Sequence, residues 1–457
     1  MSTITLDRLS HRRVLHIAVP IVLSNLTVPL LGLVDTGVVG QLGAPEPIGA
    51  VGIGAIILTS VYWVFGFLRM GTSGLVAQSH GAGDQPEVGA HLLRALAIAM
   101  AAGLAFIALQ VPIAWAAFRL APASDAVEAL ARDYLAIRIW GAPATIGLYA
   151  ITGWLIAVER TRAMLALQLV QNGLNIALSF AFALGLGWGV AGVAWATLIA
   201  EMAGLLGGLW LARHVLARAL HAARTTASLF AADKMNRLAR VNGDIMIRSV
   251  LLQGCMTSFL FLGAGQGDVP LAANQVLLQF LALTAYALDG FAFAAESLVG
   301  QAVGARRPDR VRRASLMTSA WGLGGALILG AAFILGGGAL IDILTTSPQV
   351  RAEARTYLPW LGMAPLAGVA GWMLDGIFIG ATLTREMRVA MIRSVAVFVA
   401  CVLILPPLWG NHGLWASLMA LNLARAVTML RLYPRAEAAA TAPPQHAPQN
   451  AAQNAAL

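Results

Sequence analysis

The sequence predicts an all-α membrane protein with twelve transmembrane helices in two six-helix lobes, related by a pseudo-twofold axis along the membrane normal. Of its 457 residues, 59% are hydrophobic and only 11% are charged. That balance suits a bundle of membrane helices and exceeds what a soluble core needs. The apolar residues form twelve long runs, and two short motifs recur at one constant spacing. Composition therefore predicts the class, while the runs and the repeat predict the architecture.

The apolar runs fall into two sets of six, and each run is long enough to cross a bilayer. They lie at 14–40, 47–78, 90–118, 128–157, 163–186 and 190–213, and then at 238–263, 270–303, 311–340, 354–381, 388–408 and 412–432. We therefore divide the chain into an N-terminal lobe (1–215), a cytoplasmic inter-lobe linker (216–236) and a C-terminal lobe (237–435). A tail (436–457) follows, and its Ala, Pro, Gln and Asn content predicts disorder.

Arginine and lysine gather in the connections on one side of the predicted bundle. They precede the first span and follow spans four, six, eight and ten, whereas the connections 41–48, 184–189 and 263–270 carry neither residue. The positive-inside rule then places both termini in the cytoplasm, for a multi-pass protein of the plasma (inner) membrane. The net charge of +9 is thereby explained by topology, and we expect no nucleic-acid partner.

Two motifs of the first half recur in the second half. Gly74–Gln78 matches Ser297–Gln301, and Thr161–Met164 matches Thr384–Met387. The differences 301 minus 78 and 385 minus 162 are both 223. Because an even number of spans separates the copies, the two halves have parallel topology and are related by an axis along the membrane normal.

One carboxylate, Asp35, lies inside the first apolar run. A charge at membrane depth costs about 2.5–3.5 kcal/mol on insertion scales, so such residues usually carry ions or protons. The alternative is a polar residue that only packs helices together. Pro20 and Pro29 each remove a backbone hydrogen bond from this span, which makes it bendable.

Polar residues in span five follow the spacing i, i+4, i+7, i+11 and therefore share one helical face: Gln168, Asn172, Asn175 and Ser179. Such a stripe is typical of hydrogen bonding between membrane helices. We expect Asn175 in particular to contact the Asp35 site. The other residues of the stripe serve either coupling or helix packing.

A longer stripe lies on one face of span eight: Gln275, Gln279, Tyr286, Asp289 and Glu296. Two acids without a neutralising partner in an apolar run are costly if they only pack helices. We therefore interpret this face as the wall of a substrate cavity in the C-terminal lobe.

Four further charges lie within or beside the spans. Asp244 and Arg248 are one helical turn apart at the start of span seven, so we predict a neutralised structural pair, with a substrate contact as the alternative. Arg69 in span two is predicted to extend towards the cytoplasmic surface. Asp375 in span ten could bind an ion or substrate, or stabilise the packing of the lobe.

Several of these segments resemble the MATE family (multidrug and toxic compound extrusion), and within it the DinF-like branch. The matching segments are Asp35 with Pro20, Phe67–Gln78, Asn172 with Asn175, Asp244–Arg248, Asp289–Arg306 and Leu374–Met387. The resemblance implies a V-shaped pair of lobes, with Asp35 and Asn175 at the coupling site of the N-terminal lobe. One position departs from the family: many relatives carry an aspartate where this chain has Ser179, which argues against a two-carboxylate site.

The sequence and the resemblance together predict a secondary active exporter that exchanges amphiphilic, often cationic compounds for protons or sodium by alternating access. We expect a monomer with no cofactor beyond the coupling ion, and no metal site. A flippase for lipid-linked precursors is the rival within the same superfamily, but it would need a more cationic cavity. A membrane-embedded enzyme is disfavoured because the chain has no HExxH motif, nucleophile elbow or Walker lysine motif.

Overall fold

The computed structural model describes residues 9–120, 124–225 and 229–441, and these ranges are almost entirely helical. The N-terminal lobe consists of α1 (His11–Gly40), α2 (Glu46–Trp63), α3 (Gly66–Gly81), α4 (Gln85–Ala108), α5 (Gln110–Leu120), α6 (Asp125–Arg138), a 3₁₀ turn (Ile139–Gly141), α7 (Ala142–Ala157), α8 (Thr161–Ser179), a π-helical segment (Phe180–Gly185) and α9 (Gly189–Thr225). The C-terminal lobe consists of α10 (Ala232–Ala264), α11 (Asp268–Gly304), α12 (Pro308–Leu344), α13 (Pro348–Gly380), α14 (Thr384–Leu430) and α15 (Pro434–Ala439).

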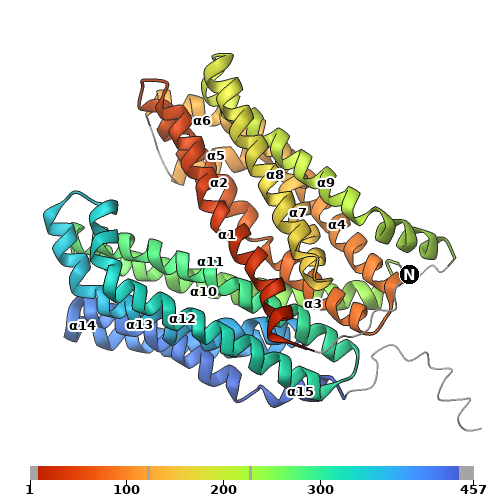
Figure 1. The fold of residues 1–457 in the computed structure, drawn as a ribbon. Helices are drawn as coiled ribbons and strands as arrows, with labels where there is room; N and C mark the ends of the chain where they lie inside the picture. Colours follow the sequence, from red (N-terminus) through yellow and green to blue (C-terminus); the bar gives the residue numbers. More distant parts are fainter. Residues whose placement is uncertain (1–8, 121–123, 226–228, 442–457) are drawn as a thin grey trace, which may run out of the picture.

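The two lobes form a V (Figure 1). They diverge towards the end that carries the connections 41–45 and 345–347, and they meet where α3 packs against α11. Helix α1 contacts both α8 of its own lobe and α11 of the other lobe. The space between the lobes is therefore open at one end and closed at the other.

All twelve predicted spans are helical, although several are interrupted. In the part of the chain that the structure describes, eleven stretches are long and apolar enough to cross a membrane. The last of them, α14, contains two predicted spans. Its backbone leaves helical geometry between these spans, at Gly410 (φ 55°, ψ −133°). Span two is similarly divided into α2 and α3. The prediction of an all-α, twelve-span membrane fold is confirmed.

The lobe ends differ from the predicted boundaries. Helix α9 continues to Thr225 and α10 begins at Ala232, so much of the predicted linker is helical. Helix α15 continues to Ala439, and Ala436 and Ala440 are buried. The prediction that disorder begins at Ala436 is therefore wrong for residues 436–441, which pack against the lobe. The remainder of the predicted tail, 442–457, lies outside the described residues.

The internal repeat is visible in the backbone as well as in the sequence. Residues with positive φ recur as Gly83 and Arg306, Glu159 and Thr382, and Gly187 and Gly410. The differences 306 minus 83, 382 minus 159 and 410 minus 187 are all 223, the spacing of the sequence motifs. Equivalent connections in the two lobes therefore turn in the same way.

The helices within each lobe approach closely at equivalent glycines. A Cβ atom at Gly153 would collide with the backbone of Arg69, and one at Gly376 would collide with the backbone of Ala292. These contacts pair α7 with α3 and α13 with α11, the helices that meet at the centre of the V. Small residues at such crossings allow the backbone-to-backbone packing on which membrane helices depend.

The break in α14 is held by a buried amide pair. Asn274 of α11 donates to Asn411 Oδ1 at 2.8 Å, and Asn411 donates back to Asn274 Oδ1 at 3.0 Å. The same Asn274 oxygen accepts from the indole N–H of Trp415 at 2.9 Å. Because Asn411 directly follows Gly410, this network fixes the direction of the second half of α14.

We expect Asn274→Leu to lower the free energy of unfolding by about 1–3 kcal/mol, because it leaves the Asn411 amide and the Trp415 N–H buried without partners. Thermal unfolding of the purified protein in detergent measures the loss. Gln275→Leu, at the next and exposed position, is the matched control and should change stability little. Equal unfolding temperatures for the two variants would contradict the proposed role of the network.

Candidate functional site

Asp35 lies on α1 in a polar cluster inside the N-terminal lobe. Its side chain is buried and accepts a hydrogen bond from Ser179 Oγ of α8 at 3.4 Å. In the part of the chain that the structure describes, Asp35 forms no salt bridge. Asn175 does not bond to Asp35. It donates to Thr197 Oγ1 of α9 at 2.8 Å, while its own carbonyl oxygen is buried without a hydrogen-bond partner.

A second buried charge pair stands near this cluster. Arg138 of α6 donates to both carboxylate oxygens of Glu201 on α9, at 2.6 and 2.9 Å. Both charges act electrostatically on Asp35. Since the bidentate contact neutralises Arg138 and Glu201 against each other, Asp35 remains the carboxylate of this cluster without a cation of its own.

The other residues of the span-five stripe tie α8 to α1. Asn172 donates to Thr27 Oγ1 at 3.0 Å and accepts from Gln168 at 2.9 Å. Nearer the start of α1, Pro20 cannot donate to the carbonyl of His16, and the Thr161 hydroxyl of α8 donates to that carbonyl at 3.2 Å instead. Helix α1 is thus held by side chains of α8 where its own backbone bonding is interrupted.

The C-terminal lobe contains a buried cluster of three charges. Asp375 Oδ2 of α13 accepts from both Arg248 of α10 and Arg425 of α14, and all three residues are buried. The predicted pairing of Asp244 with Arg248 is therefore wrong. Asp244 instead pairs with Arg388 at 2.7 Å and accepts from the Thr384 hydroxyl at 3.2 Å, both on α14.

Asp244 and Arg248 pair with other residues because their side chains lie in different surroundings. Asp244 and Arg248 are adjacent on α10, but Arg248 is buried against α13 and α14, whereas Asp244 is partly exposed near the start of α14. Each charge therefore meets its partner on another helix. Arg248 occupies the buried position, and the carboxylate of Asp375 neutralises its charge.

The span-eight stripe, on α11, is divided by burial. Gln275 and Gln279 are exposed, Tyr286 and Asp289 are half-buried, and Glu296 is fully buried. Asp289 experiences the charges of Arg69, Asp375, Arg248 and Arg425 and has no hydrogen-bond or salt-bridge partner within the described ranges. The exposed and half-buried residues of the stripe remain accessible on α11, whereas Glu296 does not.

Glu296 does not line a cavity here, contrary to the prediction. Its Oε2 lies 3.4 Å from Arg69 Nη1 of α3, in the other lobe, and its Oε1 is buried without a hydrogen-bond partner. Arg69 also lies 3.9 Å above the ring of Phe293. Because Arg69 is only 9% exposed, the prediction that it extends to the cytoplasmic surface is wrong. This inter-lobe pair neutralises both residues.

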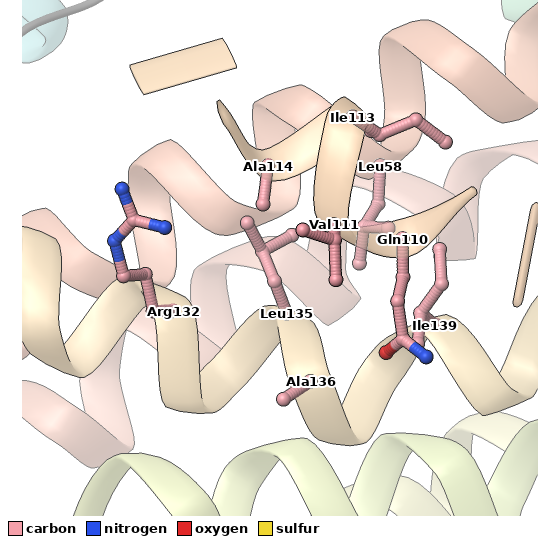
Figure 2. Close-up of a pocket in the computed structure, with 9 residues that line it drawn as sticks. All are labelled: Leu58, Gln110, Val111, Ile113, Ala114, Arg132, Leu135, Ala136 and Ile139. Atoms are coloured by element: carbon pink, nitrogen blue, oxygen red, sulfur yellow. The ribbon is translucent and has the colours of Figure 1, made fainter. Parts of the chain in front are cut away.

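Two hollows lie away from these clusters. Figure 2 shows a pocket of about 200 Å³ between α2, α5 and α6, with Arg132 and Gln110 as its polar side chains. An apolar groove of about 250 Å³ is bordered by α1, α11 and α12, including Val22 and Phe291. None of the predicted site residues lines either hollow. No group of three metal-ligating side chains occurs in the ranges that the structure describes.

Two site residues of the N-terminal lobe, Arg138 and Glu201, were not predicted, and neither was Arg425. All three lie inside apolar runs, so the depth argument applied to Asp35 would have identified them. Thr197 carries no comparable signal, because threonine is common in membrane helices.

A two-lobed bundle of membrane-spanning helices with a parallel internal repeat and buried charges defines a multi-pass membrane protein of the secondary-transporter class. Within that class, the chain belongs to the MatE family, whose model matches residues 20–181 and 245–405.

Known relatives cover nearly the whole chain. It is 39% identical over 428 residues to DNA damage-inducible protein F of Escherichia coli strain K12, covering 93% of this chain and 92% of the relative. It is 26% identical to the probable multidrug resistance protein NorM of Rhizobium meliloti, covering 94% and 95%. A MATE crystal structure in the bent conformation matches with a TM-score of 0.83 at 20% identity over 94% of this chain and 96% of that chain, which supports the fold.

We expect Asp375→Asn to lower the free energy of unfolding by about 3–5 kcal/mol, because it leaves two buried guanidinium groups without a counter-charge. Thermal unfolding in detergent is the measurement. Asp244→Asn is the matched control, since its partner Arg388 is one-third exposed and water can solvate it. A larger loss for Asp244→Asn than for Asp375→Asn would contradict the assigned pairing.

Proposed function

We propose that this chain is a secondary active exporter of amphiphilic, often cationic compounds, driven by protons or sodium ions through alternating access. Membership of the MatE family and similarity to relatives named as multidrug resistance proteins support export as the general activity. The observation that carries the proposed coupling is Asp35, a buried carboxylate with a single hydroxyl donor and no cation of its own. Such a group can bind and release a monovalent cation without breaking an ion pair.

The coupling mechanism depends on α1, because this helix touches both lobes. On the side of the N-terminal lobe, α1 is held to α8 by the Asn172–Thr27 and Thr161–His16 hydrogen bonds. On the other side, Asn25 donates to the Tyr286 carbonyl of α11 at 3.2 Å. A cation at Asp35 changes the charge beside α8, and the proline-interrupted α1 transmits the resulting bend to α11.

The cavity face of α11 supplies the substrate contacts in this proposal. Asp289 attracts a cationic group, and Tyr286, Gln275 and Gln279 offer an aromatic surface and amide groups to an amphiphile. The membrane potential supplies about 2.3 kcal/mol per charge per 100 mV. For exchange that moves one net charge, this supports a substrate gradient of roughly fifty-fold per 100 mV.

The proposed location is the plasma (inner) membrane, with both termini in the cytoplasm. In this orientation the closed end of the V, where the arginine-rich connections lie, faces the cytoplasm, and the open end faces outwards.

Thiol labelling tests the orientation. After Cys255 and Cys401 are replaced by alanine, Ala44→Cys and Ala264→Cys should react with an impermeant thiol reagent on intact cells, because both exposed positions lie at the open end. Ala82→Cys, exposed at the closed end, should react only after permeabilisation. The reverse pattern would overturn the orientation.

We expect Asp35→Asn to abolish concentrative export, because the amide keeps the shape of the side chain but cannot exchange a proton or bind sodium as an anion. The measurement is uptake of a fluorescent lipophilic cation into proteoliposomes, with proton and sodium gradients imposed separately. Asn175→Ala should reduce export less, since Asn175 bonds to Thr197 and not to Asp35. Ser179→Asp, which adds a second carboxylate beside Asp35, should alter the ion preference. Wild-type export by purified Asp35→Asn would refute the coupling proposal.

A further inference from the structure

The motif that reveals the internal repeat ends in Gln78 in one lobe and Gln301 in the other, and the coupling mechanism uses neither residue. Gln78 Nε2 donates to the Gly380 carbonyl at 3.0 Å, and Gln301 Nε2 donates to the Ala157 carbonyl at 3.0 Å. Because 301 minus 78 and 380 minus 157 are both 223, these are two copies of one bond. Each bond crosses from one lobe to the other, from α3 to α13 and from α11 to α7.

The carbonyl oxygen of each glutamine accepts from an arginine of the opposite lobe. Arg13, at the start of α1, donates to Gln301 Oε1 at 3.1 Å, and Arg237, near the start of α10, donates to Gln78 Oε1 at 3.4 Å. Arg13 and Arg237 lie on the equivalent spans one and seven, one position out of register (237 minus 13 is 224), so a similar contact is made on both sides. One half is stronger, because Arg13 also pairs with Glu159 at 2.5 Å. The position equivalent to Glu159 is Thr382, whose hydroxyl accepts from Gln78 at 3.1 Å.

Glycines bring the two backbones into contact around these bonds. A Cβ atom at Gly81 would collide with the backbone of Gln301, and one at Gly304 would collide with the backbone of Gln78. The difference, 304 minus 81, is again 223. The closed end of the V is therefore packed backbone to backbone along the axis that relates the lobes.

From this doubled arrangement we infer that Gln78 and Gln301 are the positioning residues of a gate, which holds the lobes together at the arginine-rich end and must separate when that end opens. The term gate rests on the proposed function, since it assumes that the chain alternates between two open ends.

The chemistry of the bonds suits a reversible contact. Ala157 and Gly380 are the last residues of α7 and α13, and the carbonyls at a helix C-terminus have no partner within the helix. Water can replace the glutamine amide there when the lobes part, so opening leaves no buried polar group unpaired. The Arg69–Glu296 pair lies deeper on the same α3–α11 contact, and its separation follows that of the glutamines.

The reporter for the test is Ser73→Cys. Ser73 is fully buried on α3, the helix that packs against α11 of the other lobe, so a thiol there reacts only when the lobes separate. With Cys255 and Cys401 replaced by alanine, labelling rates are measured on purified full-length protein in nanodiscs, without substrate or ion gradient. Because the reporter is present in every variant, its own effect cancels in the comparison.

Gln78→Ala and Gln301→Ala should each raise the labelling rate by at least about two- to tenfold, the range that the loss of one hydrogen bond gives, because each removes more than one bond between the lobes. The double variant should show roughly the product of the two factors. Gln301→Glu should label no faster than Gln301→Ala, because its carboxylate keeps a charged contact with Arg13 that alanine loses, although it cannot donate to the Ala157 carbonyl. Unfolding temperatures, measured in parallel, should stay close to that of the parent.

Gln253→Ala on α10 and Gln349→Ala on α13, both at exposed positions outside the proposed substrate face, are the controls and should label at the parent rate. Labelling of the single glutamine variants within twofold of the parent would overturn the gate, as would equal acceleration by the controls. The labelling experiment measures no transport. Failure of the gate proposal in this experiment can therefore be distinguished from failure of the exporter proposal in the transport assay.

Discussion

The free-energy cost of placing a charge in a low-dielectric interior determines how the charged side chains at the centre of this molecule are paired. Arg138 is matched by Glu201, Arg69 by Glu296, and Asp375 is shared by Arg248 and Arg425. The surplus cation of that last cluster acts on Asp289. With these residues ionised, the C-terminal cluster is neutral when Asp289 is counted with it, and the Arg69–Glu296 pair is neutral by itself, whereas the Asp35 cluster carries one net negative charge. Asp35 is thus the carboxylate of its cluster that no neighbouring cation neutralises, which is the feature on which the proposed coupling depends.

Helix α1 carries Asp35 and is bonded to both lobes. A continuous helix without proline would resist bending, and its backbone carbonyls would need no outside partner. Here the carbonyl left free by Pro20 is bonded by the Thr161 hydroxyl, while Asn25 reaches across to α11. The helix that carries Asp35 is therefore anchored to both lobes by polar contacts, each of which can be exchanged when the helix bends.

Sequence reasoning succeeded where the signal is local or periodic. Run length identified the twelve spans and the spacing of 223 identified the parallel repeat. Depth singled out Asp35, which is a buried carboxylate in the structure, while its role in coupling stays a prediction. Sequence reasoning failed where the partner lies on a distant helix. Asp244 and Arg248 have the spacing of an ion pair, but each is satisfied from α13 or α14. Arg69 has a flexible stem suited to reach the surface, yet Glu296 and Phe293 hold it inside. Which residues of two distant helices face each other cannot be inferred from residue spacing in a single sequence.

The repeat also shows which features the two lobes share and where they differ. The glutamines and the glycine contacts around them recur with the same offset at the closed end, as do two of the three pairs of positive-φ turns. The central charges do not: the position equivalent to Asp35 is Ser258, that of Glu296 is Ser73, and that of Asp375 is Thr152. A symmetric closed end lets both lobes part by the same motion. The asymmetric centre places different buried charges in the two lobes, so the proposed ion site at Asp35 has no equivalent in the C-terminal lobe.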